Sequence, residues 1–384
     1  MGISSFTRKA VGEVFKEIAE GIERVNFGKK IKVGLTTLGS EHGIRELVKG
    51  GELAQQDPDI EVILIGPRIQ NTPLETVETG ECEEDLHKKM EELLQNNTID
   101  ACVTMHYNFP LGVSTVGKVV TPGRGKEMFI ATTTGTSSTD RIEAMVKNAL
   151  YGIAVARASG IQQPTIGVLN VDGARRVEKI LKQLAQNGYE ITFGESIRHD
   201  GGCVMRGNDL LSGTPDVMVT DSLTGNILIK VFSAFTTGGN YESLGYGYGP
   251  GVGKGFNKII NIISRASGAP VIAKAIRFAA DMVKGELLKL KEYEINNAEK
   301  AGLSRLLQDI EKEEVEKKDV TPPPAKPVTQ EISGIDIMEL DRAVRVLWKN
   351  GIFAKTGMGC TGPVILTAPE DYERAKELLK DYIA

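Results

Sequence analysis

Thr165-Ile-Gly-Val-Leu-Asn170 is a short apolar run that is followed at once by a helical pattern over Ala174–Gln186. The run shows no strict alternation of apolar and polar residues, which is typical of a strand covered on both faces in a parallel sheet. Five further runs of this kind occur along the chain: Ile31–Leu35, Val62–Gly66, Ala101–Met105, Met128–Ala131 and Asp216–Thr220. We therefore predict an α/β/α sandwich, with helix layers on both faces of the sheet.

The same patterns divide the chain into parts. An amphipathic helix is expected within residues 1–29, and a two-lobed α/β body within residues 30–316, as the length of 384 residues allows. Helical patterns over Asp140–Ala158 and Ala174–Gln186 connect the strand-like runs. We place the break between the two lobes near residues 151–160, with a cleft between them.

A proline-rich segment follows the body. Residues 317–332 contain Val320-Thr-Pro-Pro-Pro-Ala-Lys-Pro-Val328, a composition that favours an extended, semi-rigid linker. Residues 333–384 resume the alternation of helix and strand patterns and form a small C-terminal module that carries Cys360. A module of this size is too small to be expected to fold alone, so we expect it to dock on the body or on a partner.

Composition and charge exclude several classes of protein. The chain has 46 Lys and Arg residues against 51 Asp and Glu residues, a net charge of −5, and no basic block, so we expect no nucleic-acid partner. It has no apolar run long enough to cross a bilayer and no signal-peptide pattern before Arg8, so we expect no membrane partner. Four cysteines at irregular spacing predict no disulfide framework, and we expect a cytoplasmic enzyme.

Cys360 is the thiol with the most suggestive surroundings. It lies in the glycine-rich stretch Thr356-Gly-Met-Gly-Cys-Thr-Gly-Pro363, near Lys355 and away from acidic residues in the sequence. A neighbouring cation lowers the pKa of a thiol, and a thiolate presented in this way can hold an acyl group as a thioester. The alternative is an inert cysteine packed as a small hydrophobic residue in a tight loop.

The other cysteines are weaker candidates. Cys82 stands in an acidic run, where carboxylates raise the pKa of a thiol. Cys102 precedes His106 by four residues, and Cys203 follows His199 by four; neither pair has a second pair of ligands beside it, so we predict no metal site.

A second glycine-rich stretch is Gly245-Tyr-Gly-Tyr-Gly-Pro-Gly-Val-Gly-Lys-Gly255. It is not a Walker A loop, because Tyr248 stands where the first glycine is required. Glycines at this spacing let backbone amides close on an anion, and a helix starting near Phe256 would add its N-terminal field. The alternative is a lid or tight turn that binds no ligand. The candidate phosphate-binding residues of this stretch are Gly249, Gly251, Gly253 and Lys254.

Ser264 and Arg265 follow within Asn261-Ile-Ile-Ser-Arg-Ala-Ser267. A hydroxyl beside a guanidinium suits phosphate binding, although such a pair is also common as surface decoration. We include both residues in the candidate phosphate site.

Longer stretches resemble known enzymes. Thr165–Asn170, Gly207–Gly213 and the stretch from Asp216 to Lys230 resemble the phosphate acyltransferase of phospholipid synthesis. The segment from Gly255 through Arg265 is similar to the "NKPVNDLSRG" stretch of phosphotransacetylases, and the resemblance implies a phosphate-site role for Ser264 and Arg265. Residues 135–139 resemble the "GAxxST" loop of those enzymes. These resemblances imply a phosphotransacetylase- or isocitrate dehydrogenase-like fold, and supporting roles for Asn226, Lys230, Ser138, Thr139 and Lys147.

The acyltransferase-like body, the proline-rich linker and the terminal "GMGCTGPVI" stretch together resemble one family over essentially the whole chain. It is the alpha subunit of component C of the glycine/sarcosine/betaine reductase complex. The resemblance implies that Cys360 accepts an acetyl group, formed reductively from a carboxymethyl group on the selenocysteine of component A, and that phosphate releases acetyl phosphate. It also implies the component C beta subunit as a stable partner, with no tightly bound cofactor and with phosphate as co-substrate.

Two other functions remain open at this point. The first is a free-standing phosphate acyltransferase that uses acyl carrier protein or CoA thioesters and needs no tethered cysteine. The second is a non-catalytic subunit that only docks component A and the beta subunit.

Overall fold

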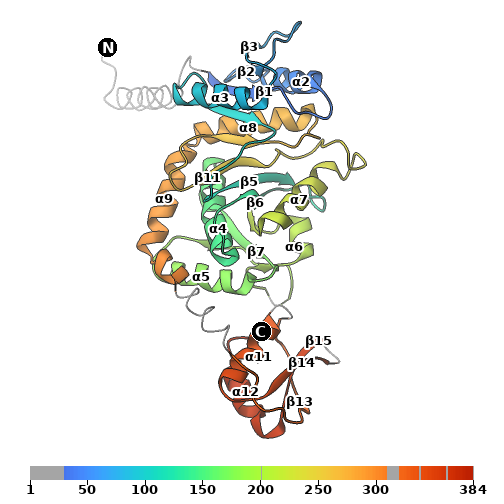
Figure 1. The fold of residues 1–384 in the computed structure, drawn as a ribbon, viewed down its shortest axis with the longest axis vertical. Coiled ribbons are helices and arrows are strands. Elements are labelled where there is room, and N and C mark those ends of the chain that lie inside the picture. Colours follow the sequence, from blue (N-terminus) through green and yellow to red (C-terminus); the bar gives the residue numbers. More distant parts are fainter. Residues whose placement is uncertain (1–29, 200, 309–319, 337–338, 360–361, 384) are drawn as a thin grey trace, which may run out of the picture.

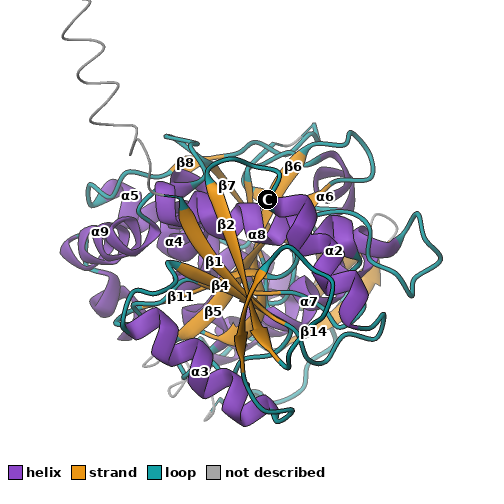
Figure 2. Ribbon diagram, turned by 90° about the horizontal axis from the view of Figure 1, so that it is seen from above, coloured by secondary structure: helices purple, strands orange, loops and turns teal. Residues whose placement is uncertain are grey.

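The fold was obtained as a computed structural model, which describes residues 30–199, 201–308, 320–336, 339–359 and 362–383. A 12-stranded sheet forms the body, and a separate three-stranded sheet forms a C-terminal module at one end of the molecule (Figure 1). Helices cover both faces of the large sheet (Figure 2), which confirms the predicted α/β class. The helix expected within residues 1–29 lies outside the described residues. None of the helices in the described part is long and apolar enough to cross a membrane.

The first half of the large sheet is parallel throughout. Its strands, in spatial order, are β3 (Glu75–Glu78), β2 (Ile60–Gly66), β1 (Ile31–Thr36), β4 (Ala101–Thr104) and β12 (Ile260–Ile262). Its helices are α2 (Ile44–Ala54), α3 (Glu83–Gln95) and α8 (Ala269–Lys284). Helices α2 and α8 pack on each other, and α8 also packs on β1 and β4.

The second half mixes parallel and antiparallel strands. These strands are β5 (Val113–Val120), β6 (Glu127–Thr136), β10 (Val217–Val219), β7 (Thr165–Leu169), β8 (Thr192–Phe193) and β9 (Val204–Met205). The helices are α4 (Arg141–Ala158), α5 (Ala174–Gln186), α6 (Gly207–Ser212), α7 (Ser222–Ala234) and α9 (Leu287–Lys300). Strands β6, β10 and β7 run parallel, whereas β5 is antiparallel to β6.

The chain passes between the two halves through residues 105–112, through β11 (Gly249–Gly253) with the segment that joins it to β12, and a third time between α8 and α9. The sequence placed the lobe break near residues 151–160 instead. That interval coincides with the second half of α4 and the turn after it, so the chain is helical across most of it. The apolar pattern of a long buried helix gave no sign of these crossings, because the crossing segments are short.

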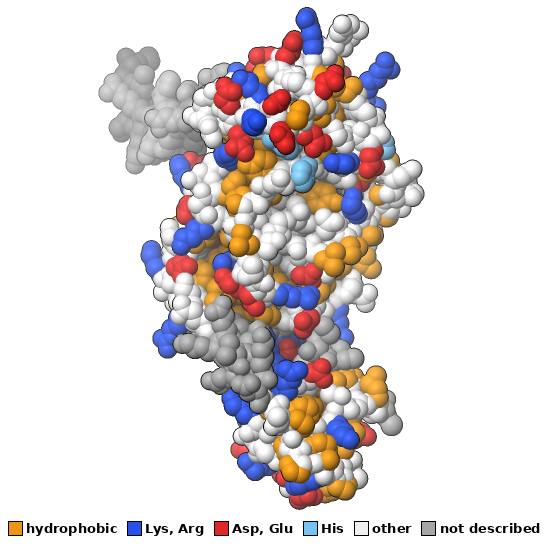
Figure 3. Space-filling model, in the orientation of Figure 1, with side chains coloured by type: hydrophobic (Ala, Val, Ile, Leu, Met, Phe, Trp, Pro, Cys, Tyr) orange, Lys and Arg blue, Asp and Glu red, His pale blue; other side chains and the backbone are white. Residues whose placement is uncertain are grey.

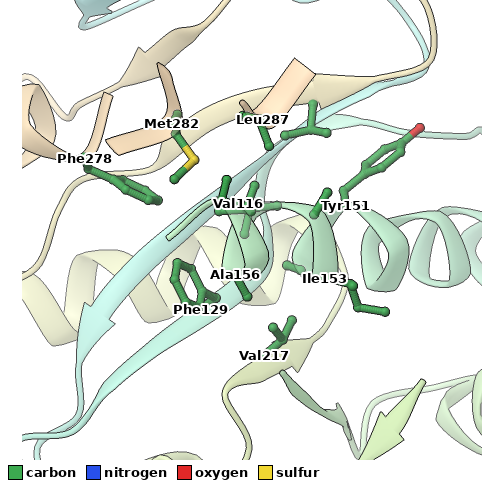
Figure 4. Packing of buried hydrophobic residues seen from close by; sticks show 14 of the residues in the cluster. Val116, Phe129, Tyr151, Ile153, Ala156, Val217, Phe278, Met282 and Leu287 are labelled. Carbon is green, nitrogen blue, oxygen red and sulfur yellow. The ribbon is translucent and has the colours of Figure 1, made fainter. Parts of the chain in front are cut away.

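The core fills the space between the sheet and the helices on each face. Figure 4 shows how side chains of β5, β6 and β10 meet those of α4 and α8. Val116 and Phe129 are buried there, and the ring centroid of Phe129 lies 6.2 Å from that of Phe278. A second cluster on the opposite face includes Ile65, Met90 and Ile130.

Strand β11 lies in the middle of the sheet, antiparallel to β12 on one side and to β5 on the other. Its glycines are needed because the backbone of neighbouring segments passes too close for a side chain. A Cβ atom at Gly249 would lie 1.8 Å from the carbonyl oxygen of Val116, and one at Gly251 would lie 2.3 Å from the ring of Phe109. The middle of the glycine-rich stretch, Gly249–Gly253, is therefore a buried strand rather than the anion-binding loop expected from its sequence.

The C-terminal module has its own small core. It consists of β13 (Gln330–Ile332), α11 (Leu340–Lys349), β14 (Ala354–Gly359), β15 (Gly362–Thr367) and α12 (Tyr372–Leu378). Ala343, Leu347, Ile365 and Leu379 are completely buried within it. Residues 320–329 of the predicted linker form neither helix nor strand, and Lys326 of this segment pairs with Asp371 of the module at 3.1 Å.

We predict that Gly249→Ala destabilises the protein far more than Gly255→Ala. Both residues have positive φ angles, 79° and 75°, so each substitution costs about 1–2 kcal/mol of backbone strain. Only Gly249 also faces backbone within 4 Å, which adds about 1–3 kcal/mol of overpacking. Urea unfolding of the two variants measures the difference, and equal losses of stability would contradict the role assigned to β11.

Candidate functional site

A cavity of about 630 Å³ opens between the two halves of the sheet. Its walls come from segments far apart in the sequence: residues 105–111 after β4, residues 134–136 at the end of β6, Asn226 and Lys230 on α7, and residues 262–265 at the end of β12. Strands β4 and β12 are parallel, so the segments that follow them leave the sheet at the same edge. Ligand sites in α/β proteins commonly lie at the carboxyl edge of parallel strands.

Lys230 and Ser264 meet on the cavity wall. The Nζ atom of Lys230 donates to the Oγ atom of Ser264 at 3.2 Å and lies 3.7 Å from a carboxylate oxygen of Glu242. Glu242 is buried, and its other oxygen accepts a hydrogen bond of 2.9 Å from Ser267, whose Oγ in turn accepts one from the backbone N–H of Ser264. The buried carboxylate thus holds the ammonium and the serine segment together.

Arg265 adds a second cation next to Ser264. Its side chain is exposed, and its carbonyl oxygen accepts a hydrogen bond of 2.9 Å from the backbone N–H of Glu41. Among the described residues, no carboxylate lies within 4.0 Å of the Arg265 guanidinium, whereas Lys230 is already paired with Glu242. A hydroxyl, an ammonium and an unpaired guanidinium in one cavity are the groups that bind a phosphate.

The opposite wall is formed by the end of β6. Thr134, Gly135 and Thr136 line the cavity there, and Asn226 of α7 donates through its side-chain amide to the Thr133 carbonyl oxygen at 3.1 Å. Gly135 has a φ angle of 79°, and a Cβ atom there would lie 2.6 Å from the carbonyl oxygen of Val113. A glycine is therefore required where the chain turns at the cavity.

The supporting residues that were predicted after Gly135 do not line the cavity; they are Ser138, Thr139 and Lys147. Ser138 donates to Glu143 at 2.8 Å, and Lys147 forms an ion pair with the same carboxylate at 2.5 Å. Thr139 is exposed and does not line the cavity. All three belong to the first turns of α4 and the segment before it, and the contacts of Ser138 and Lys147 with Glu143 stabilise the start of that helix.

The glycine-rich stretch also lies outside the cavity lining. Gly249, Gly251 and Gly253 are buried within β11, so their backbone groups face neighbouring strands rather than a ligand. Lys254 follows the strand and is exposed. Of this stretch only Tyr248 contributes to the cavity wall. The structure thus brings Ser264, Arg265, Asn226 and Lys230 together and leaves the glycines and Lys254 apart.

Sequence reasoning missed the part of the wall that follows β4. His106, Tyr107 and Phe109 line the cavity. Tyr107 donates to Glu91 at 2.8 Å, and burial, reinforced by that carboxylate, raises the pKa of its hydroxyl well above the usual range. The ring of Phe109 lies 5.0 Å from that of Tyr107. The feature of the sequence that could have indicated this wall is the dense run of aromatic and polar residues from Met105 to Leu111, directly after a buried strand.

Figure 3 shows this face in space-filling form. Uncharged side chains cover most of the middle of the body, and charged side chains gather above them beside the histidines. Among the described residues, no group of three or more His, Cys, Asp or Glu side chains is arranged to hold a metal ion.

Comparison with known proteins identifies the family to which the chain belongs. A family model described as "Fatty acid synthesis protein" matches residues 31–366. The glycine/sarcosine/betaine reductase complex component C subunit alpha of Peptoclostridium acidaminophilum is 57% identical over 378 residues, which make up 97% of this chain and 98% of the relative. The chain belongs to this family of component C alpha subunits.

More distant relatives match between about half and two thirds of the chain. The phosphate acyltransferase of Thermotoga neapolitana is 28% identical over 232 residues, covering 52% of this chain and 68% of that protein. The crystal structure of a branched-chain phosphotransacylase from Enterococcus faecalis V583 covers 66% of this chain and 99% of that chain, with a TM-score of 0.46 and 16% identity.

The thiol expected to be reactive in this component C alpha subunit, Cys360, lies outside the described residues. Its neighbours are described: Gly359 ends β14, Gly362 begins β15, and the two glycines are paired across the hairpin. A Cβ atom on Gly359 would lie 2.8 Å from a carboxylate oxygen of Glu331 on β13. The sequence pointed to Lys355 as the nearest charged group, and the acid was missed because β13 lies more than 20 residues earlier in the chain.

Two other cysteines of the alpha subunit, Cys102 and Cys203, are buried. Burial raises the pKa of the Cys102 thiol far above its usual range. Burial, together with the Glu178 carboxylate that accepts from the thiol at 3.3 Å, raises the pKa of Cys203 to about 12. Neither can serve as a thiolate near neutral pH.

We predict that iodoacetamide at pH 8 modifies Cys82 in the folded protein and leaves Cys102 and Cys203 unmodified. Cys82 is exposed, whereas a pKa of about 12 leaves about one Cys203 molecule in 10,000 as thiolate at this pH. Peptide mass spectrometry after timed labelling measures each site, with urea-unfolded protein as the control in which all sites react. Labelling of Cys102 or Cys203 at the rate of Cys82 in folded protein would contradict the burial described here.

Proposed function

We propose that this chain transfers an acetyl group from a thioester on Cys360 to inorganic phosphate and so forms acetyl phosphate within a glycine/sarcosine/betaine reductase complex. The observation that carries the proposal is the meeting of Lys230 and Ser264 at 3.2 Å, with Arg265 beside them, in one cavity between the sheet halves. The family relationship at 57% identity supports the complex in which this step belongs.

The proposed step needs no oxidant, reductant or metal. A phosphate oxygen attacks the carbonyl carbon of the thioester, the carbon–sulfur bond breaks, and the electron pair leaves with sulfur. The proton that hydrogen phosphate loses passes to the departing thiolate, so the products are acetyl phosphate and the free Cys360 thiol. The protein supplies position and charge: cations hold the phosphate, and a hydroxyl or ammonium faces the oxyanion that develops in the transition state.

In this proposal the acetyl group reaches Cys360 from partner subunits. The carboxymethyl group on the selenocysteine of component A is the precursor, and the component C beta subunit is the stable partner of this chain. The module that carries Cys360 has its own apolar core, and it meets the body where Asn170 of the body donates to Asp336 at 3.4 Å. We propose that the module, joined through the proline-rich segment, presents the thioester to the cavity.

One observation favours a second candidate. The chain is similar over 232 residues to a phosphate acyltransferase, and the residues that line the cavity all belong to the body. A chain that acts on acyl carrier protein or CoA thioesters would use the same cavity and would need neither the module nor Cys360. The two candidates differ in the thiol that carries the acyl group.

We predict that Arg265→Ala raises the phosphate concentration required for acetyl phosphate formation by about ten- to a hundredfold, because a charge-assisted bond to an anion contributes about 1.5–3 kcal/mol. The matched control is Lys254→Ala, which removes an exposed cation that lies outside the cavity lining. Acetyl phosphate is measured against phosphate concentration in the assembled complex. Equal effects of the two substitutions would remove Arg265 from the phosphate site.

We predict that Cys360→Ser abolishes acetyl phosphate formation in the assembled complex and that the acetyl adduct on Cys360 disappears from peptide mass spectra. The serine hydroxyl stays protonated near neutral pH and is a poor replacement for a thiolate. The matched control is Cys82→Ser, at an exposed thiol of the body.

The outcomes separate the three functions. Acyl transfer from CoA or carrier-protein thioesters that survives in Cys360→Ser would favour the free-standing acyltransferase. Normal acetyl phosphate formation in Cys360→Ser and Arg265→Ala alike would leave the chain a docking subunit.

A further inference from the structure

The hairpin that carries Cys360 has an exposed methionine near its end. Met358 of β14 is 76% exposed, the largest exposed fraction among the large hydrophobic side chains in the described part of the chain. A single exposed hydrophobic residue is common on a protein surface, but this one has a particular place. It precedes Cys360 by two residues, so no more than about 7 Å of chain separates it from the residue proposed to carry the acetyl group. A surface that binds Met358 therefore also receives the thioester.

The hairpin is narrow around Met358 because the residues on either side are glycines. Strand β14 stays paired with β15 up to Gly359, at the edge of the module (Figure 1). A Cβ atom at Gly357 would lie 2.9 Å from the side chain of Leu366. One at Gly359 would lie 2.8 Å from the side chain of Val364. Larger residues would push these side chains aside and widen the hairpin. Met358 thus projects from a thin end of the module, a shape that can enter an opening in another surface.

The cavity of the body has a wall that the proposed phosphate site does not use. Tyr107, Phe109 and Leu111 form this apolar wall, and Leu111 is 69% exposed. The cavity volume of about 630 Å³ is in the range of sites that enclose drug-sized ligands, so it exceeds what a phosphate and an acetyl group fill. The remaining space suits part of the protein segment to which the acetyl group is attached.

The aromatic rings of the apolar wall are already held in place. Tyr107 donates its hydroxyl hydrogen to Glu91 at 2.8 Å, and Glu91 also accepts from Lys258 at 2.9 Å. The ring of Phe109 lies 5.0 Å from that of Tyr107 and 5.6 Å from that of Phe256, both in edge-to-face arrangements. A hydrophobic side chain can therefore bind these rings without the cost of ordering them first.

We propose that the end of the β14–β15 hairpin enters the cavity of its own chain and that Met358 packs on the apolar wall. This inference rests on the proposed function, because it specifies how the thioester on Cys360 reaches a phosphate held near Ser264. Methionine side chains are flexible, and their sulfur makes favourable contacts with aromatic rings. The contact anchors the hairpin through a residue that takes no part in the reaction, which leaves Cys360 free to react.

The connection between body and module allows this docking. No described helix or strand of the module packs extensively on one of the body. The hydrogen bond from Asn170 to Asp336 is 3.4 Å long, beyond the usual range, so it holds the module weakly. Residues 309–325 separate Gln308 of the body from Lys326, which pairs with Asp371 of the module. Fully extended, a chain of this length spans about 55–60 Å.

The first test is disulfide trapping, which does not depend on activity. Leu111→Cys and Met358→Cys are combined in a full-length chain that also carries Cys82→Ser and Cys360→Ser, so that the remaining native cysteines are the two buried ones. After oxidation with oxidised glutathione, we expect a disulfide within one chain, seen as a joined peptide in mass spectra. The matched control places the body cysteine at Tyr293→Cys instead, a half-exposed site on α9 outside the cavity, and should stay unjoined.

The second test is a double-mutant cycle on the release of acetyl from Cys360. The assembled complex is loaded, phosphate is added, and loss of the acetyl adduct is followed by peptide mass spectrometry. Met358→Ser and Phe109→Ala should each slow this loss about two- to tenfold, the range of a sulfur–aromatic contact. Because the two side chains touch in the proposed complex, the double variant should be no slower than the slower single variant. The effects of Met358→Ser and Tyr293→Ala should instead multiply.

The outcomes distinguish this inference from the proposed function. A disulfide within one chain, combined with an acetyl adduct that phosphate does not remove, would support the docking and contradict the proposed function. Trapping no stronger than in the Tyr293→Cys control would overturn the docking. So would a disulfide only between two chains, seen as a band of doubled mass, which would place the hairpin in the cavity of a second copy. Effects of Met358→Ser and Phe109→Ala that multiply would overturn it as well.

Discussion

The backbone pairing of β11 is the constraint on which the rest of the structure depends. This one strand is hydrogen-bonded to β12 of the parallel half and to β5 of the mixed half, so it closes a single sheet across two lobes. The pairing is possible only because Gly249 and Gly251 leave room for the carbonyl of Val116 and the ring of Phe109. The glycines act on the site indirectly, by fixing where the end of β12 lies.

The candidate site is a consequence of that closure. Ser264 and Arg265 follow β12, whereas Asn226 and Lys230 belong to a helix on the other half of the sheet. Buried Glu242 then links the two sides, since it pairs with Lys230 and accepts from Ser267. The cations and hydroxyl of the cavity are positioned by the joined sheet and by one internal carboxylate.

The sequence alone predicts those strands and helices whose apolar residues form a recognisable pattern within the element itself. The run Thr165–Asn170 matches β7 (Thr165–Leu169), and the helical pattern over Ala174–Gln186 matches α5. It could not predict β11, because glycine has low strand propensity and the pairing depends on neighbours more than 100 residues away. Resemblance to known enzymes singled out Ser264, Arg265 and Lys230, but their buried partner Glu242 carries no local pattern that distinguishes it from an exposed acid.

The close approach of Gly225 to the Thr132 carbonyl has a further consequence, which concerns access to the cavity. Helix α7 is fixed to the sheet at this point, so the wall that bears Asn226 and Lys230 cannot move independently of the body. The facing segment from Met105 to Leu111 lies outside helix and strand, and Leu111 is 69% exposed. Access to the cavity is therefore shaped by a helix fixed to the sheet on one side and by a loop on the other, and substitutions in residues 105–111 change the shape of the cavity more than its charge.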